Sequence, residues 1–125
     1  MIDTTHITHA IASHATWKYH LRQAIRTGES EWNVPSTRLD DQCEFGKWLR
    51  TLPPEDRTGP HWTRVRDRHQ VFHEAAAHVL DLALAGRRAE AEDAIALESE
   101  FARASNQLTL AMTAWQKDLA ELVPA

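Results

Sequence analysis

The sequence has one cysteine, few glycines and no excess of positive charge, and each of these shortages excludes a class of protein. A single cysteine among 125 residues cannot form a disulfide framework within the chain, so nothing indicates a small secreted scaffold. Only four glycines and few valines and isoleucines argue against a β-sandwich or a barrel. A net charge of −4 excludes a generic nucleic-acid-binding protein, which is normally basic.

Long hydrophobic runs are also missing. No stretch approaches the roughly eighteen consecutive apolar residues of a membrane-spanning helix, so no membrane insertion is expected. The N-terminus lacks the basic region and the apolar run of a signal peptide. The expected location is therefore the cytoplasm, where a thiol stays reduced and available to a metal ion.

What the sequence does contain is the composition of a helical protein. Alanine and leucine together far outnumber valine and isoleucine, and the length suits a single domain over residues 1–125. Apolar spacing and the positions of proline and glycine predict four helices, over residues 3 or 4 to 27, 40 or 41 to 52, 60 to 85 and 88 to 123. The expected fold is all-α, an antiparallel four-helix-type bundle of three long helices and one short helix.

Two details of this arrangement are also predicted. Residues 28–39 are expected to form a connecting loop, held against the body of the protein by Trp32 and Val34. The last helix would be roughly 50 Å long, so it must either bend or pack on another chain.

Eight histidines are unusual for a chain of this length, and a helical wheel sorts them into two groups. His14 shares the apolar face of the first predicted helix, and His69 and His73 lie four residues apart on the apolar face of the third. The other five are predicted at the rim or on the surface: His6, His9, His20, His61 and His78.

A single inward histidine is commonly satisfied by a hydrogen bond to a carbonyl group, but three need more partners than a helical core supplies. Each buried imidazole has two nitrogens that must find partners. A shared metal ion would satisfy one nitrogen of each ring.

The single cysteine, Cys43, is predicted in the first turn of the short helix, after Asp40 or Asp41 as the cap. The positive end of the helix dipole would lower the pKa of its thiol there. Gly46 follows one turn later on the same face, where close packing would explain a residue that weakens a helix. Taken alone, Cys43 is better interpreted as a small buried hydrophobic residue, the commoner role of a free cysteine.

Taken together, His14, Cys43, His69 and His73 form a set of three nitrogen ligands and one sulfur ligand, which suits a closed tetrahedral Zn²⁺ site. A di-iron site is disfavoured because no carboxylate clearly shares these faces. A metalloprotease is disfavoured because Gln70 stands where the catalytic glutamate of a His-Glu-x-x-His motif belongs.

These motifs resemble the chemoreceptor zinc-binding (CZB) domain family of bacterial signalling proteins. The matching features are His14-x-x-Trp17-Lys18, Cys43-x-Phe45-Gly46-x-Trp48, His69-x-x-x-His73 and a following helix with Ser105 and a leucine-rich stripe. The resemblance extends from about residue 8 to residue 120. It implies a four-helix-type bundle, commonly a homodimer, with one zinc ion bound by His14, Cys43, His69 and His73.

The resemblance also implies a function. CZB domains are usually attached to chemotaxis receptors or diguanylate cyclases, and they sense zinc, or oxidants such as hypochlorous acid, through the zinc-bound thiolate. Cys43 would then be the redox-sensitive residue. The 125 residues contain no receptor coiled coil and no cyclase domain, so we expect a free-standing member or an isolated fragment.

Three hypotheses for the function follow. The first is a non-enzymatic zinc-dependent sensory domain in chemotaxis or cyclic-di-GMP signalling, partnered by a receptor or cyclase. The second is a helical dimerisation module whose core histidines are only hydrogen-bonded or hold a purely structural zinc ion. The third is a small zinc enzyme, which four protein ligands disfavour because catalysis needs an open coordination position.

Overall fold

The fold is described by a computed structural model that covers residues 2–121, and the regular secondary structure in this part of the chain is all helix, without a strand. The all-α prediction is therefore confirmed. In chain order the elements are α1 (Thr4–Ala15), α2 (Trp17–Thr27), α3 (Val34–Arg38), α4 (Glu44–Thr51), the 3-10 helix η1 (Pro54–Arg57), α5 (Pro60–Leu84), α6 (Arg88–Ile95) and α7 (Glu100–Glu121). The predicted count of three long helices and one short helix is wrong, because two of the predicted long helices are interrupted.

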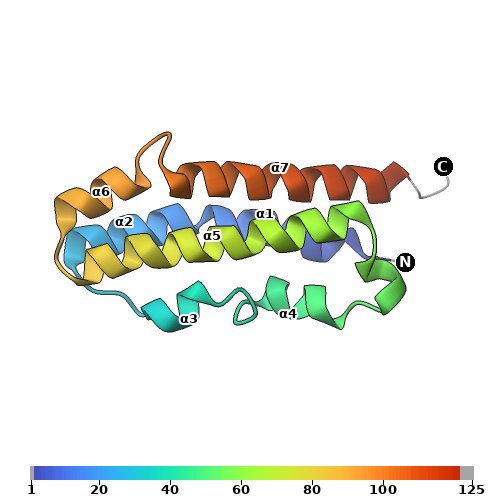
Figure 1. Cartoon of the computed structure of the whole chain (residues 1–125), viewed down its shortest axis with the longest axis horizontal. Helices are drawn as coiled ribbons and strands as arrows, with labels where there is room; N and C mark the ends of the chain where they lie inside the picture. Colours follow the sequence, from blue (N-terminus) through green and yellow to red (C-terminus); the bar gives the residue numbers. More distant parts are fainter. Residues whose placement is uncertain (1, 122–125) are drawn as a thin grey trace.

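The first predicted helix is interrupted at Thr16 and becomes α1 and α2. The Thr16 hydroxyl donates to the carbonyl oxygen of Ser13 at 2.6 Å, which competes with regular helical bonding. The two helices still follow one another along one line (Figure 1). Gly28 ends α2 in the left-handed conformation with φ 76°, as its position predicted.

The predicted loop over residues 28–39 is wrong in part, because it contains the short helix α3. The Asn33 side chain caps this helix by accepting from the Ser36 N–H at 2.8 Å, and Pro35 lies in its first turn. Trp32 and Val34 are half-buried against the core, as predicted.

The last predicted helix bends, and it forms α6 and α7. The turn between them contains Glu98 in a left-handed conformation with φ 69°, and Ser99 then accepts from the Ala102 N–H at 3.1 Å as a helix cap. The predicted end of this helix at residue 123 lies outside the described residues.

Helix α5 is the element that the others share. It packs most extensively against α7 and also contacts α2, α3 and α4. Figure 1 shows α5 running between α7 and the segment that contains α3 and α4. No helix within residues 2–121 combines the length and the apolar character needed to cross a lipid bilayer.

Candidate metal centre

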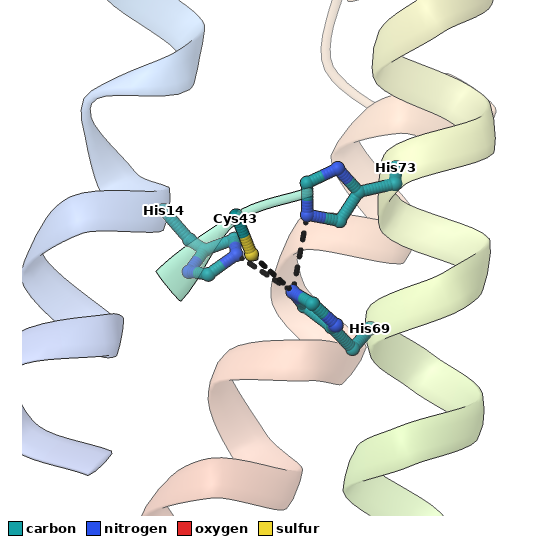
Figure 2. Close-up of side chains that lie close together, drawn as sticks. All are labelled: His14, Cys43, His69 and His73. Carbon is teal, nitrogen blue, oxygen red and sulfur yellow. Dashed lines mark hydrogen bonds between the residues drawn. The ribbon is translucent and has the colours of Figure 1, made fainter. Parts of the chain in front are cut away.

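Four side chains from three helices converge beside α5 (Figure 2). His14 lies near the end of α1, Cys43 caps the N-terminus of α4, and His69 and His73 project from adjacent turns of α5. All three histidines are buried, which confirms the prediction from the helical wheel. Among the histidines predicted at the rim or surface, His6, His9 and His78 are exposed, whereas His20 and His61 are half-buried.

The ligand atoms of these four residues lie within 4.8 Å of one another. The Nε2 atom of His69 is 3.0 Å from Nε2 of His14, 3.0 Å from Nε2 of His73 and 3.3 Å from Sγ of Cys43. Three nitrogens and one sulfur are therefore directed at a common point. The residues that carry them are spread from position 14 to position 73 of the sequence but are adjacent in space.

Hydrogen bonds on the far side of two rings fix which nitrogen faces this point. The Nδ1–H of His14 donates to the carbonyl oxygen of Ala10 at 2.8 Å. The Nδ1–H of His73 donates to the carbonyl oxygen of Thr37, in α3, at 2.9 Å. Because a neutral imidazole carries one proton, the Nε2 atoms of both rings present lone pairs to the cluster.

This arrangement cannot be satisfied by hydrogen bonds alone. If His69 carries its proton on Nε2, that one proton faces the lone pairs of both His14 and His73. If His69 carries it on Nδ1, three nitrogen lone pairs face one another. A cation at the common point would satisfy all of them, so the donor set fits a metal ion.

Burial keeps these rings neutral. Burial lowers the pKa of His14 to about 4. It lowers the pKa of His69 further, to about 2, and the neighbouring rings of His73 and His14 also disfavour a positive charge on His69. The pKa of His73 is also lowered by burial, although its hydrogen bond to Thr37 opposes the shift. Neutral imidazole is the form that binds metals, so the histidines are ready to do so at neutral pH.

Cys43 differs from the sequence prediction in two respects. It is itself the N-cap of α4, with its sulfur accepting from the Gly46 N–H at 3.4 Å, so the helix begins later than expected. The predicted lowering of its pKa is also wrong for the metal-free protein. Burial raises the pKa of the thiol, and the N–H groups of Gly46 and Phe45 offset this only in part.

Gly46 explains how the turn that carries Cys43 packs so closely against the start of α4. A Cβ atom at this position would overlap the carbonyl oxygen of Asp40, so the turn before α4 can fold onto the helix only because residue 46 is glycine. The close packing predicted for Gly46 is confirmed.

Aromatic rings form the walls of the cluster. Phe45 and Phe72 are buried and contact the His14 ring, with centroid distances of 5.9 and 5.2 Å. Trp48 contributes only indirectly, because it stacks on Phe45 and on the exposed His6. Trp17 lines two cavities that border Cys43.

Sequence reasoning missed two features of this site. Thr37, whose carbonyl group orients His73, lies in a helix that was expected to be a loop, although the Asn33 and Pro35 pattern could have indicated that helix. Asp40 was considered only as a helix cap, whereas its carboxylate lies 3.9 Å from Nδ1 of His69.

Comparison with known proteins agrees with this geometry. No curated protein and no solved structure gives a significant match to the chain. The model of the chemoreceptor zinc-binding domain matches residues 14–80, which is more than half of the chain and begins at the first residue of the cluster. The chain belongs to the chemoreceptor zinc-binding domain family, CZB, and its cofactor is zinc.

Proposed function

We propose that this protein is a zinc-dependent sensory domain in bacterial signalling, in which His14, Cys43, His69 and His73 hold one zinc ion. The observation that carries the proposal is the convergence of their four ligand atoms within 4.8 Å. Three imidazole nitrogens and one thiolate form a complete tetrahedral set. Because this set has no position for a substrate or a reactive water molecule, the protein is proposed to be a sensor and not an enzyme.

Cys43 is proposed as the ligand that responds to oxidants. A bound zinc ion keeps its sulfur as a thiolate, the form that oxidants attack. Two cavities of about 140 and 380 Å³ border Cys43, and they also border His14 and His73 respectively, whereas His69 is fully buried. In its reaction with hypochlorous acid, the thiolate gives two electrons, sulfur gains the oxygen as sulfenic acid, and chloride leaves as the O–Cl bond breaks.

The response is proposed to be a displacement of α4. His14, Cys43 and the His69–His73 pair tie α1, α4 and α5 to one point, and α4 contacts α1 and α5 far less extensively than α5 contacts α7. Loss of ligation at Cys43, through oxidation or zinc depletion, would remove one of the attachments that hold the start of this short helix in place.

We further propose that the whole chain, residues 1–125, is one such domain, that it forms an antiparallel four-helix-type bundle, and that it works as a homodimer. Val71 of α5 and Leu110 of α7 are large apolar residues with exposed fractions of 48% and 68%, which supports burial against a second copy. The output partner is proposed to belong to a chemoreceptor or a diguanylate cyclase pathway.

Metal analysis tests the proposed ligands. We expect about one zinc ion per chain in the purified protein and almost none in the Cys43→Ala, His69→Ala double variant. The matched control is His9→Ala, His78→Ala, which removes two exposed histidines and should keep its zinc. Equal zinc in the wild type and the Cys43, His69 variant would refute the proposed site.

Treatment with hypochlorous acid tests the sensory role. We expect an equimolar dose to release zinc, and a thiol reductant to restore zinc binding, because sulfenic acid is reversible. Zinc that remains bound while Cys43 is demonstrably unmodified would instead support a purely structural ion.

A further inference from the structure

His69 differs from the other two histidines of the cluster in its second nitrogen. His14 and His73 each donate their Nδ1–H to a backbone carbonyl group, at 2.8 and 2.9 Å. The Nδ1 atom of His69 has no hydrogen-bond partner within the described residues. Because the exposed fraction of His69 is 0%, bulk water does not supply one. A buried polar atom without a partner is costly and calls for an explanation.

The carboxylate of Asp40 faces this nitrogen. Its Oδ2 atom lies 3.9 Å from Nδ1 of His69, and its side chain is only 17% exposed. Its other oxygen, Oδ1, lies 3.5 Å from the guanidinium group of Arg50, which is half exposed. The carboxylate is thus positioned between a buried imidazole and a flexible surface arginine, with a long contact to each.

The backbone holds Asp40 firmly in this place. Its carbonyl oxygen packs against Gly46 of α4, and the same carbonyl lies 3.7 Å from Sγ of Cys43. A shift of about 1 Å in the side chain alone would bring its carboxylate to hydrogen-bonding distance of His69.

We propose that Asp40 is a positioning residue for the zinc site, which accepts the Nδ1–H of His69 when Nε2 of that ring binds the metal. The inference rests on the proposed function, in which His69 is a ligand. Once Nε2 is committed to a metal, the single proton of the neutral ring must be on Nδ1. Hydrogen bonding to a carboxylate then fixes the orientation of the ring and increases the basicity of its ligating nitrogen.

Zinc affinity, measured by competition with a chelator, tests this role. We expect Asp40→Ala to weaken zinc binding by about 10- to 100-fold. Asp40→Asn should fall between Asp40→Ala and the wild type, because an amide oxygen also accepts a hydrogen bond. Asp41→Ala is the matched control, since Asp41 also lies within 4.0 Å of Arg50 and should leave the affinity within about twofold. Wild-type affinity in Asp40→Ala would overturn the proposal.

Arg50→Gln separates this role from the ion pair between Asp40 and Arg50. The substitution removes the competing contact and leaves Asp40 free to approach His69, so zinc affinity should be unchanged or higher. If Arg50→Gln loses as much zinc affinity as Asp40→Ala does, the effect belongs to the ion pair between Asp40 and Arg50, and the proposal is overturned.

Nitrogen-15 NMR of zinc-loaded wild-type protein tests the same claim without any substitution. We expect His69 to carry its proton on Nδ1, with a proton resonance far downfield and slow to exchange with solvent, and we expect this resonance to move in Asp40→Asn but not in Asp41→Asn. A proton resonance that is unaffected by Asp40→Asn would contradict the proposal.

If the His69→Ala variant still binds zinc, the proposed ligand set is refuted. If His69→Ala loses zinc binding but Asp40→Ala keeps the wild-type affinity, only the role of Asp40 is refuted.

Discussion

At the scale of single residues, the turn from Asp40 to Gly46 carries most of the site's geometry. Cys43 caps α4, the Asp40 carbonyl group lies against Gly46, and the Gly46 N–H donates to the sulfur of Cys43. The position of the thiol therefore depends on the contact between the Asp40 carbonyl oxygen and residue 46, which leaves space for a hydrogen atom but not for a Cβ atom. A side chain at residue 46 would displace this turn from its present position, and Cys43 lies within the turn.

We expect Gly46→Ala to lower the free energy of unfolding by about 1–3 kcal/mol and to weaken zinc binding. The physical reason is the overlap of the added methyl group with the Asp40 carbonyl oxygen. Urea denaturation and chelator competition measure the two effects. Gly59→Ala is the control, because its Cβ would meet no atom within 4 Å, and its cost should stay below about 1 kcal/mol. Equal behaviour of the two variants would contradict this account of the turn.

Proton release on zinc binding is predicted at the same scale. The lowered pKa values of the three histidines mean that they are already neutral at pH 7, whereas burial raises the pKa of Cys43 and keeps its thiol protonated until the metal binds. Calorimetry in buffers of different ionisation enthalpy should therefore find about one proton released per zinc ion at pH 7. The apparent affinity should rise about tenfold per pH unit. Release of two or more protons would show that the histidines are charged in the metal-free protein.

At the scale of helices, the part of the site that could be predicted from the sequence is the part that depends on helical periodicity. His14, His69 and His73 each lie within an uninterrupted helix, so the wheel placed them correctly. Thr16 interrupts the first helix only after His14 and therefore did not disturb that assignment.

What periodicity could not predict were features decided by local hydrogen bonds or by tertiary contacts. The bend between α6 and α7 depends on a left-handed Glu98, a residue without a strong preference for that conformation. The start of α4 depends on the packing of Gly46 against a turn. The raised pKa of Cys43 depends on its burial, which the sequence around it does not specify.

Helix α4 should respond most strongly to zinc removal. Its attachment to the rest of the protein would combine the proposed Cys43 ligation with the packing of Phe45 and Leu49, and α4 contacts α1 and α5 less extensively than α7 contacts α5. Hydrogen exchange of the amides over residues 44–51 is expected to accelerate by at least about tenfold when the metal is chelated. Amides in the central part of α7, which packs extensively on α5, provide the internal control and should change much less. A uniform acceleration throughout the protein would refute a local displacement.

At the scale of the whole molecule, the site places three polar rings inside a core whose other buried side chains, Thr37 excepted, are apolar. The core around them includes Ile7, Val65 and Phe72, all with an exposed fraction of 0%. Zinc binding would stabilise the fold by satisfying these rings and by joining residues that are far apart in the sequence. The same burial makes the metal-free protein sensitive to acid.

We expect the metal-free protein to lose stability as the pH falls from 6.5 towards 4. In this range the unfolded chain protonates its histidines near their ordinary pKa of 6.5, whereas the folded chain keeps His14 and His69 neutral. The unfolded state therefore binds more protons, and the free energy of unfolding should fall by about 1.4 kcal/mol per pH unit for each such histidine. Urea denaturation at several pH values measures the slope.

The variants His14→Gln and His9→Gln provide the check on this slope. His14→Gln should reduce the slope by the contribution of one histidine, about 1.4 kcal/mol per pH unit. His9→Gln changes an exposed histidine and should leave the slope unchanged. A stability that does not vary between pH 4 and 6.5 would contradict the burial of neutral imidazoles.

X-ray absorption spectroscopy at the zinc edge of the purified protein tests the central claim most directly, because it counts the ligands of the ion itself. We expect four ligands, with one sulfur at about 2.3 Å and three nitrogens at about 2.0–2.1 Å. A spectrum without a sulfur ligand, or with an oxygen ligand in place of an imidazole, would contradict the assignment of His14, Cys43, His69 and His73 as the zinc site.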